Sequence, residues 1–129
     1  MIRMYFDQNA TQLVRDNWEP SAGAPDAYEG PGAGGEVIAK RYLYNPEHAT
    51  KTYEGVTLSA YQDDAITDLK YALDEGGQPG AFVDILNLPD GDYATPFPVW
   101  VKVIFAPTTE PLKRTTVKHW IQAQRELLK

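Results

Sequence analysis

The sequence predicts an all-β fold, an antiparallel β-sandwich that forms a single domain. Short runs of alternating apolar and polar residues recur along the chain, and Gly, Pro, Asn and Asp residues separate them at fairly even spacing. The 129 residues are enough for one hydrophobic core and too few for two complete domains. The sequence shows no internal repeat and no heptad pattern, so a solenoid or a coiled coil is not expected.

Residues 1–18 are expected to form a strand segment at the start of the domain. Ile2, Met4 and Phe6 occupy alternate positions, which is the period of a half-buried strand. The turn-forming residues that begin at Asp7 interrupt this pattern, and residues 11–14 can continue the strand after them.

Residues 19–35 differ from the rest of the chain in composition. Gly and Pro dominate this stretch, and neither residue supports a regular hydrogen-bond ladder within a sheet. Few of its side chains could contribute to a core. We expect an extended arm or a long loop here, and irregular stretches of this length are usually functional or disordered.

The sandwich core is expected over residues 36–129, where each strand-like run ends at a turn signal. Residues 97–105 form the most apolar run, with Trp100 and Ile104 on the side opposite its valines. We expect a central strand with one face on the core and the other against a neighbour, a partner or a covering segment. The strand-like runs are residues 37–44, 56–61, 69–73, 82–88 and 97–105.

The last segment, residues 115–129, fits two periodicities. Thr115, Val117 and Ile121 have strand propensity, but apolar residues of the segment also fall at helical spacing. We favour a strand through about Ala123, followed by a helical turn or a tail, and the sequence leaves strand and helix both open.

The composition excludes several classes of function. The formal net charge of -6 repels a phosphate backbone, so nucleic acid is not an expected partner. The absence of cysteine excludes thiol catalysis and thiolate metal sites. No stretch approaches the about 20 apolar residues that cross a bilayer, and the start lacks the apolar run of a signal peptide. We therefore expect no membrane contact and synthesis in the cytoplasm.

The residues needed for common catalytic or cofactor sites are few. His48 and His119 are the only histidines, and their spacing matches no metal-binding motif. Ser21 and Ser59 are the only serines, and neither lies in the nucleophile elbow of a hydrolase. We expect a non-catalytic protein without a cofactor.

Acidic residues gather around three of the expected turns and leave two further interpretations open. Asp63, Asp64, Asp90 and Asp92 could hold calcium through their oxygens, or could form the paired carboxylates of a small hydrolase. Their spacing differs from that of an EF-hand loop, and turns favour Asp because its side chain hydrogen-bonds the local backbone. These acids are therefore weak calcium candidates.

Aromatic residues are more numerous than a core of this size needs. Tyr and Trp are enriched where proteins meet partners, so we expect partner contacts at Trp18, Tyr28, Trp100 and Trp120. For Trp100 and Trp120, the alternative is that they cover the opposite sheet. Because β-sandwiches can present aromatic platforms to sugars, a carbohydrate- or surface-binding module is a second interpretation.

Four segments together resemble small immunoglobulin-like β-sandwich proteins among the virion structural proteins of tailed bacteriophages. They are KRYLYN (40–45), YEGVTLSA (53–60), LNLPDGD (86–92) and PFPVWVKV (96–103). The resemblance covers residues 37–124 and implies a capsid decoration, neck or tail/baseplate component located in the virion. The implied partners are other virion proteins and copies of itself, in a homo-oligomer or another symmetric assembly. The Gly/Pro-rich stretch departs from the pattern, although an arm that reaches a neighbouring subunit is common in virions.

Overall fold

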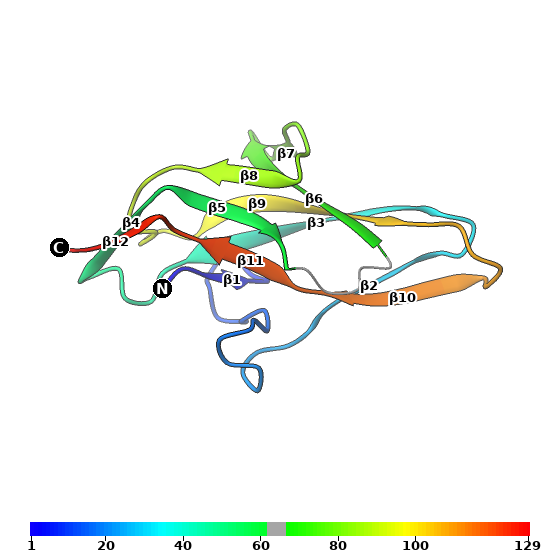
Figure 1. The fold of residues 1–129 in the computed structure, drawn as a ribbon, viewed down its shortest axis with the longest axis horizontal. Helices are drawn as coiled ribbons and strands as arrows, with labels where there is room; N and C mark the ends of the chain where they lie inside the picture. The colour runs from blue at the N-terminus through cyan, green and yellow to red at the C-terminus, as the bar shows by residue number, and fades with distance from the viewer. Residues whose placement is uncertain (62–66) are drawn as a thin grey trace.

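The computed structural model describes residues 1–61 and 67–129. Within these ranges the chain contains β-strands and no helix, so the all-β prediction is confirmed, and no helix that could span a membrane is found there. The molecule is elongated (Figure 1), with both termini at one end and the loops after β2 and β9 at the other. The strands are β1 (Arg3–Tyr5), β2 (Asp26–Pro31), β3 (Gly35–Tyr44), β4 (Lys51–Glu54), β5 (Val56–Ala60), β6 (Thr67–Glu75), β7 (Gln78–Pro79), β8 (Ile85–Leu88), β9 (Phe97–Phe105), β10 (Leu112–Val117), β11 (His119–Gln122) and β12 (Arg125–Leu128).

The first layer is an antiparallel sheet with the strand order β1-β3-β9-β6-β7. β9 is its central strand, as the apolar run over 97–105 predicted. Val99, Val101 and Val103 are fully buried, whereas the alternate residues of β9 are partly exposed. This alternation directs one face of β9 toward the core because successive side chains of a strand point to opposite faces.

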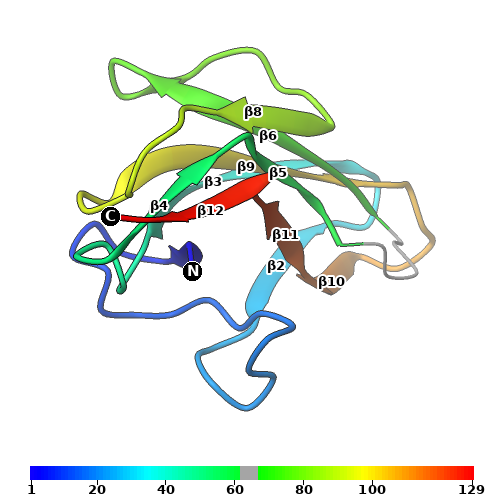
Figure 2. The ribbon, with the colours of Figure 1, turned by 60° about the vertical axis from the view of Figure 1, so that its left-hand side comes forward.

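The second layer is built around the C-terminal strands. β10, β11 and β12 follow one another along the chain and pair in turn with β2, β5 and β4, and β8 extends β5 on its other side. In Figure 2, β4, β5 and β12 are drawn across β3 and β9, and β2, β10 and β11 lie below them. Buried residues from both layers form one hydrophobic cluster, an arrangement consistent with a β-sandwich.

Two predictions about chain segments were wrong. Residues 26–31, within the expected arm or loop, form β2 and pair with β10, because the alternate residues Asp26, Tyr28 and Gly30 are buried and supply an inward face. Residues 125–128 form β12 rather than a helical turn, since they pair with β4. The strand expected through about Ala123 is confirmed by β10 and β11.

The remainder of the N-terminal loop has little regular structure but is attached to the domain. Isolated bridges join Tyr5 to Leu13 and Val14 to Ala24. Val14 is buried in the core. The loop therefore leaves β1, returns to the core at Val14 and then continues to β2 along one side of the second layer. In Figure 2 it lies below the sheets.

Candidate functional site

A pocket of about 280 Å³ lies between the N-terminal loop and β11. Its lining includes Trp18, Tyr61 and Trp120, whose exposed fractions are 70%, 38% and 45%. Its buried lining residues include the apolar Met4 and Val14. An apolar hollow with exposed aromatic side chains and a few polar groups has the composition of a ligand pocket.

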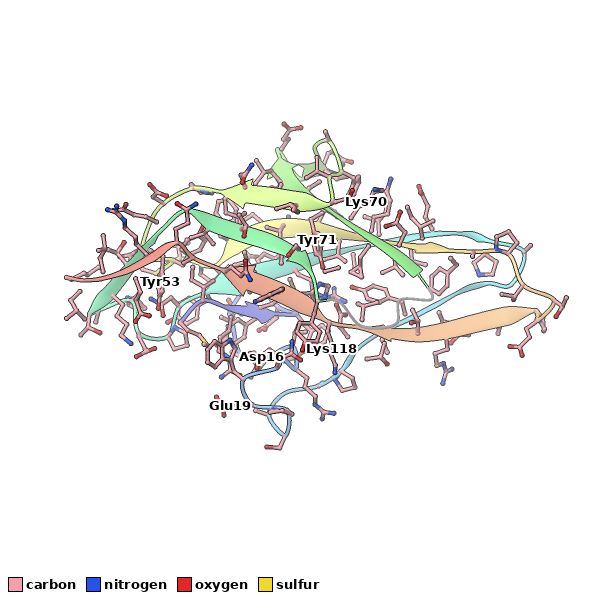
Figure 3. All side chains as sticks on the ribbon, in the orientation of Figure 1. Asp16, Glu19, Tyr53, Lys70, Tyr71 and Lys118 are labelled. Carbon is pink, nitrogen blue, oxygen red and sulfur yellow. The ribbon has the colours of Figure 1, made fainter. Side chains whose placement is uncertain are left out.

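Ion pairs and hydrogen bonds fix the loop that presents Trp18. The Asp16 carboxylate accepts hydrogen bonds from the backbone N–H groups of Trp18 (2.9 Å) and Glu19 (3.1 Å). The Arg3 guanidinium donates to Asp16 at 2.9 Å and to Glu19 at 2.7 Å, so it connects β1 to the loop. Figure 3 shows Asp16 and Glu19 together on this loop, apart from Tyr71 in the interior.

The opposite wall of the pocket is also braced. The rings of Tyr61 and Trp120 meet edge to face, with centroids 6.0 Å apart. Trp120 lies on β11, which pairs with β5 through the register Trp120↔Ser59. The backbone N–H of Tyr61 donates to the carbonyl of Lys118 at 3.0 Å. Tyr61 and Trp120 thus belong to chain segments that are held by backbone hydrogen bonds.

A buried hydrogen-bond network begins directly behind the pocket. His119 lines the pocket, and its Nε2 lies 2.6 Å from Asp26 Oδ2, while its Nδ1 lies 2.6 Å from the hydroxyl of Tyr71. Asp26 also accepts hydrogen bonds from the Tyr28 hydroxyl (2.9 Å) and from Arg41 (2.7 Å). These residues belong to β2, β3, β6 and β11, so the network joins the two layers.

The charges of the network are shifted by its burial and its contacts. Burial raises the pKa of Asp26, but the hydrogen bond from His119 and the attraction of His119 and Arg41 outweigh it, so the pKa lies below its ordinary value. Burial, reinforced by the Asp26 charge, raises the pKa of both Tyr28 and Tyr71. Asp26 is thus held as a carboxylate and both tyrosines as neutral hydroxyls.

The order Asp26, His119, Tyr71 resembles a proton relay, but its geometry braces the fold. The Tyr71 side chain is fully buried, and the side chain of Asp26 has no exposed surface. Because no substrate can reach the Tyr71 hydroxyl, this group has no substrate atom within range for attack or proton transfer. The His119 ring links both neighbours, since Nε2 lies within hydrogen-bond distance of Asp26 and Nδ1 within hydrogen-bond distance of the Tyr71 hydroxyl.

The residues expected at partner contacts fall in three different environments. Trp18 and Trp120 meet at the pocket, which no sequence pattern indicated. Tyr28 is buried in the network. Trp100 lies in the five-stranded sheet, where its indole N–H donates to Asp74 at 2.9 Å and Lys40 lies 5.6 Å from its ring. Their role in partner contacts stays a prediction.

The weak calcium candidates are only partly described. Asp63 and Asp64 lie outside the described residues. Asp90 accepts a hydrogen bond from the backbone N–H of Gly55 at 3.0 Å, and Asp92 contacts the Lys129 ammonium at 2.5 Å. No group of three or more ligating side chains occurs in the described part of the chain.

Sequence reasoning did not find the network or the role of Tyr61. Asp26 lies in the Gly/Pro-rich stretch, 93 positions from His119, and nothing local connects them. The one available signal is that Asp26, Tyr28 and Gly30 alternate with exposed residues, but two of these three residue types are common in loops.

Comparisons with protein-family models, with curated proteins and with solved structures find no match to this chain.

Proposed function

We propose that this chain is a non-catalytic structural protein of a tailed-phage virion, a capsid decoration, neck or tail/baseplate component that acts through contacts between subunits. The proposal includes an immunoglobulin-like affiliation of the sandwich and synthesis in the host cytoplasm before the chain joins the virion. The support is the likeness of the segments 40–45, 53–60, 86–92 and 96–103 to such proteins, together with one feature of the sheet edges.

Three edge strands carry exposed aliphatic side chains. Ile85 of β8 is 61% exposed, Leu112 of β10 is 58% exposed and Leu128 of β12 is 81% exposed. Each of these strands has one hydrogen-bonded neighbour in the part of the chain that the structure describes. Proteins that remain monomeric usually protect such edges with charges, prolines, bulges or covering segments. Open edges with aliphatic side chains favour the addition of strands from another chain.

The β8 edge suits a second copy of this chain. β8 contains no charged residue, so two copies can meet there without repulsion between like charges. The adjacent Asp84 is ion-paired with Lys70 at 2.7 Å. Antiparallel pairing of β8 with its own copy uses the same surface on both subunits, which is the arrangement of a closed twofold dimer. The contact joins the β11-β5-β8 sheets of the two copies.

Sedimentation equilibrium of the full chain, from about 1 μM to about 1 mM, tests this contact. We expect concentration-dependent dimerisation, and Ile85→Lys weakens it at least about tenfold because it places charges at the edge. Ile38→Lys is the matched control, since Ile38 is 42% exposed but lies on β3 of the five-stranded sheet, away from the β8 edge. A chain that stays monomeric throughout, or an Ile85→Lys variant that dimerises like the unmodified chain, contradicts the proposal.

A further inference from the structure

We propose that the pocket between the N-terminal loop and β11 binds the ring of a neutral saccharide. This site is separate from the β8 edge and does not depend on the subunit contacts proposed above. The size of the pocket, its aromatic walls, its unused hydrogen-bonding groups and its balance of charge support the assignment.

The pocket has room for one ring. Its volume of about 280 Å³ lies just below the range of about 300–1,000 Å³ that is typical for drug-sized ligands. The three aromatic side chains at the pocket supply flat apolar faces, and the most exposed of them, Trp18, has 70% of its surface open to solvent. A ligand with an apolar face of its own would remove this surface from water.

The backbone that carries Trp18 and the ring of Trp120 are held in place before any ligand arrives. Asp16 fixes the backbone at Trp18 and is itself held by Arg3, and the edge-to-face contact with Tyr61 orients Trp120. A rigid site loses little conformational entropy on binding, so a weak set of contacts is enough to give measurable affinity.

Several hydrogen-bonding groups at the pocket have no partner among the described residues. They are the Asn17 carboxamide, the indole N–H groups of Trp18 and Trp120, and the Tyr61 hydroxyl. Donors at the rims of aromatic faces suit a ligand with hydroxyl groups around the edge of an apolar ring. A saccharide has this construction, whereas a purely apolar ligand would leave these groups without partners when it displaced their water.

The balance of charge favours a neutral ligand. Arg3 is paired with Asp16 and Glu19, and both oxygens of Asp16 already accept hydrogen bonds. Arg15, the other basic residue at the pocket, donates to the backbone carbonyl of Gly23. Among the described lining residues the one carboxylate is that of Asp16, and it is already occupied, so a cationic ligand gains no ion pair from them. Arg3 and Arg15 are offset by the two acids Asp16 and Glu19, so an anionic ligand gains little net attraction. An apolar peptide side chain is the competing occupant, and the test distinguishes it.

The indole N–H resonances provide an internal control. The chain has three tryptophans, of which Trp18 and Trp120 line the pocket while Trp100 donates its indole N–H to Asp74 in the other sheet. Methyl glycosides of glucose, galactose, mannose and N-acetylglucosamine are titrated separately into the ¹⁵N-labelled full chain. We expect at least one of them to shift the Trp18 and Trp120 signals with a millimolar Kd and to leave Trp100 unchanged.

Variants assign the binding to the pocket. Trp18→Ala removes an exposed side chain, so the fold is retained, and we expect at least about a tenfold loss of affinity. Leu112→Ala, which removes an exposed apolar side chain of β10 outside the pocket lining, keeps the affinity. Silence of all four glycosides at about 100 mM overturns the proposal, as does equal affinity in Trp18→Ala. Silence with the glycosides, combined with shifts of the same two indoles by a tryptophan- or leucine-containing peptide, assigns the pocket to a polypeptide instead.

Discussion

Replacing Asp26 by Asn tests whether the buried network holds the two layers together. Asp26 accepts hydrogen bonds from Tyr28, Arg41 and His119, and its side chain has no exposed surface. Asn has nearly the same shape, so the variant removes the charge and one acceptor without opening a cavity. Both carboxylate oxygens of Asp26 accept hydrogen bonds, whereas Asn has one accepting oxygen and one donating NH2 group. This NH2 group must therefore face one of the three donors.

The expected loss of stability is about 3 kcal/mol. Breaking a buried ion pair typically costs about 3–5 kcal/mol, because the remaining charge stays buried without a partner. Arg41 keeps 14% of its side-chain surface exposed, so water can partly compensate its charge, which places the expected loss at the low end of that range. Contacts within one network are not additive, so this loss is that of the network as a whole.

Urea denaturation followed by circular dichroism measures this loss. With an m-value of about 2 kcal/mol/M, the transition midpoint should fall by about 1.5 M. Asp84→Asn is the matched control, because Asp84 has a side chain that is 75% exposed and pairs with Lys70 at the surface. We expect this control to change stability by less than about 1 kcal/mol.

The pH dependence gives an independent readout. The pKa of Asp26 is lower in the folded chain than its ordinary value of 3.8, so its stabilising effect is fully present above about pH 5. The effect is lost as the pH falls through the folded-state pKa. The difference in stability between the unmodified chain and Asp26→Asn should therefore shrink below about pH 4.

A double variant separates loss of the network from general damage. Adding Arg41→Met to Asp26→Asn removes the charge left behind, and Arg41 Nε is already buried without a hydrogen-bond partner. We expect the double variant to be at least as stable as Asp26→Asn alone. A loss below about 1 kcal/mol for Asp26→Asn, or additive losses in the double variant, would refute the reasoning.

Two further predictions concern packing and ionisation. Gly30→Ala should destabilise the fold by about 1–3 kcal/mol in urea denaturation, because the new Cβ would lie 2.5 Å from a ring carbon of Phe105. Gly91→Ala is the control: its Cβ would have no atom within 4 Å, so stability should change by less than about 0.5 kcal/mol. Equal effects would contradict the close approach at Gly30. Burial and the charge of Asp90 raise the pKa of Tyr93 to about 12. The stability that its neutral hydroxyl supplies is therefore complete below about pH 10 and is lost as the pH rises through about 12. Phenolate absorbance should show this late titration, and Tyr93→Phe should remove one tyrosine's share of it, since Tyr28 and Tyr71 also titrate late. A Tyr93→Phe variant that instead loses a titration at the ordinary value of 10.0 would contradict the burial.

Part of the fold could be predicted because its signal is local. The valines of β9 alternate with Trp100, and this period of two identified both the strand and its central position. The same signal failed for residues 26–31, where Gly and Pro are typical of loops. There the pairing with β10 and the buried face of β2 outweigh the local preference, which is a tertiary effect that composition does not contain.

The sequence alone determined the all-β class, the central strand and the classes of chemistry that the missing cysteines exclude. Only the tertiary structure decided which distant residues meet. Asp26 and His119 are 93 positions apart, and Trp18 and Trp120 approach one pocket from opposite ends of the chain. Alternation reports which face a side chain occupies within its own strand, but contact across layers depends on strand order and register. That order is fixed by the packing of the whole domain.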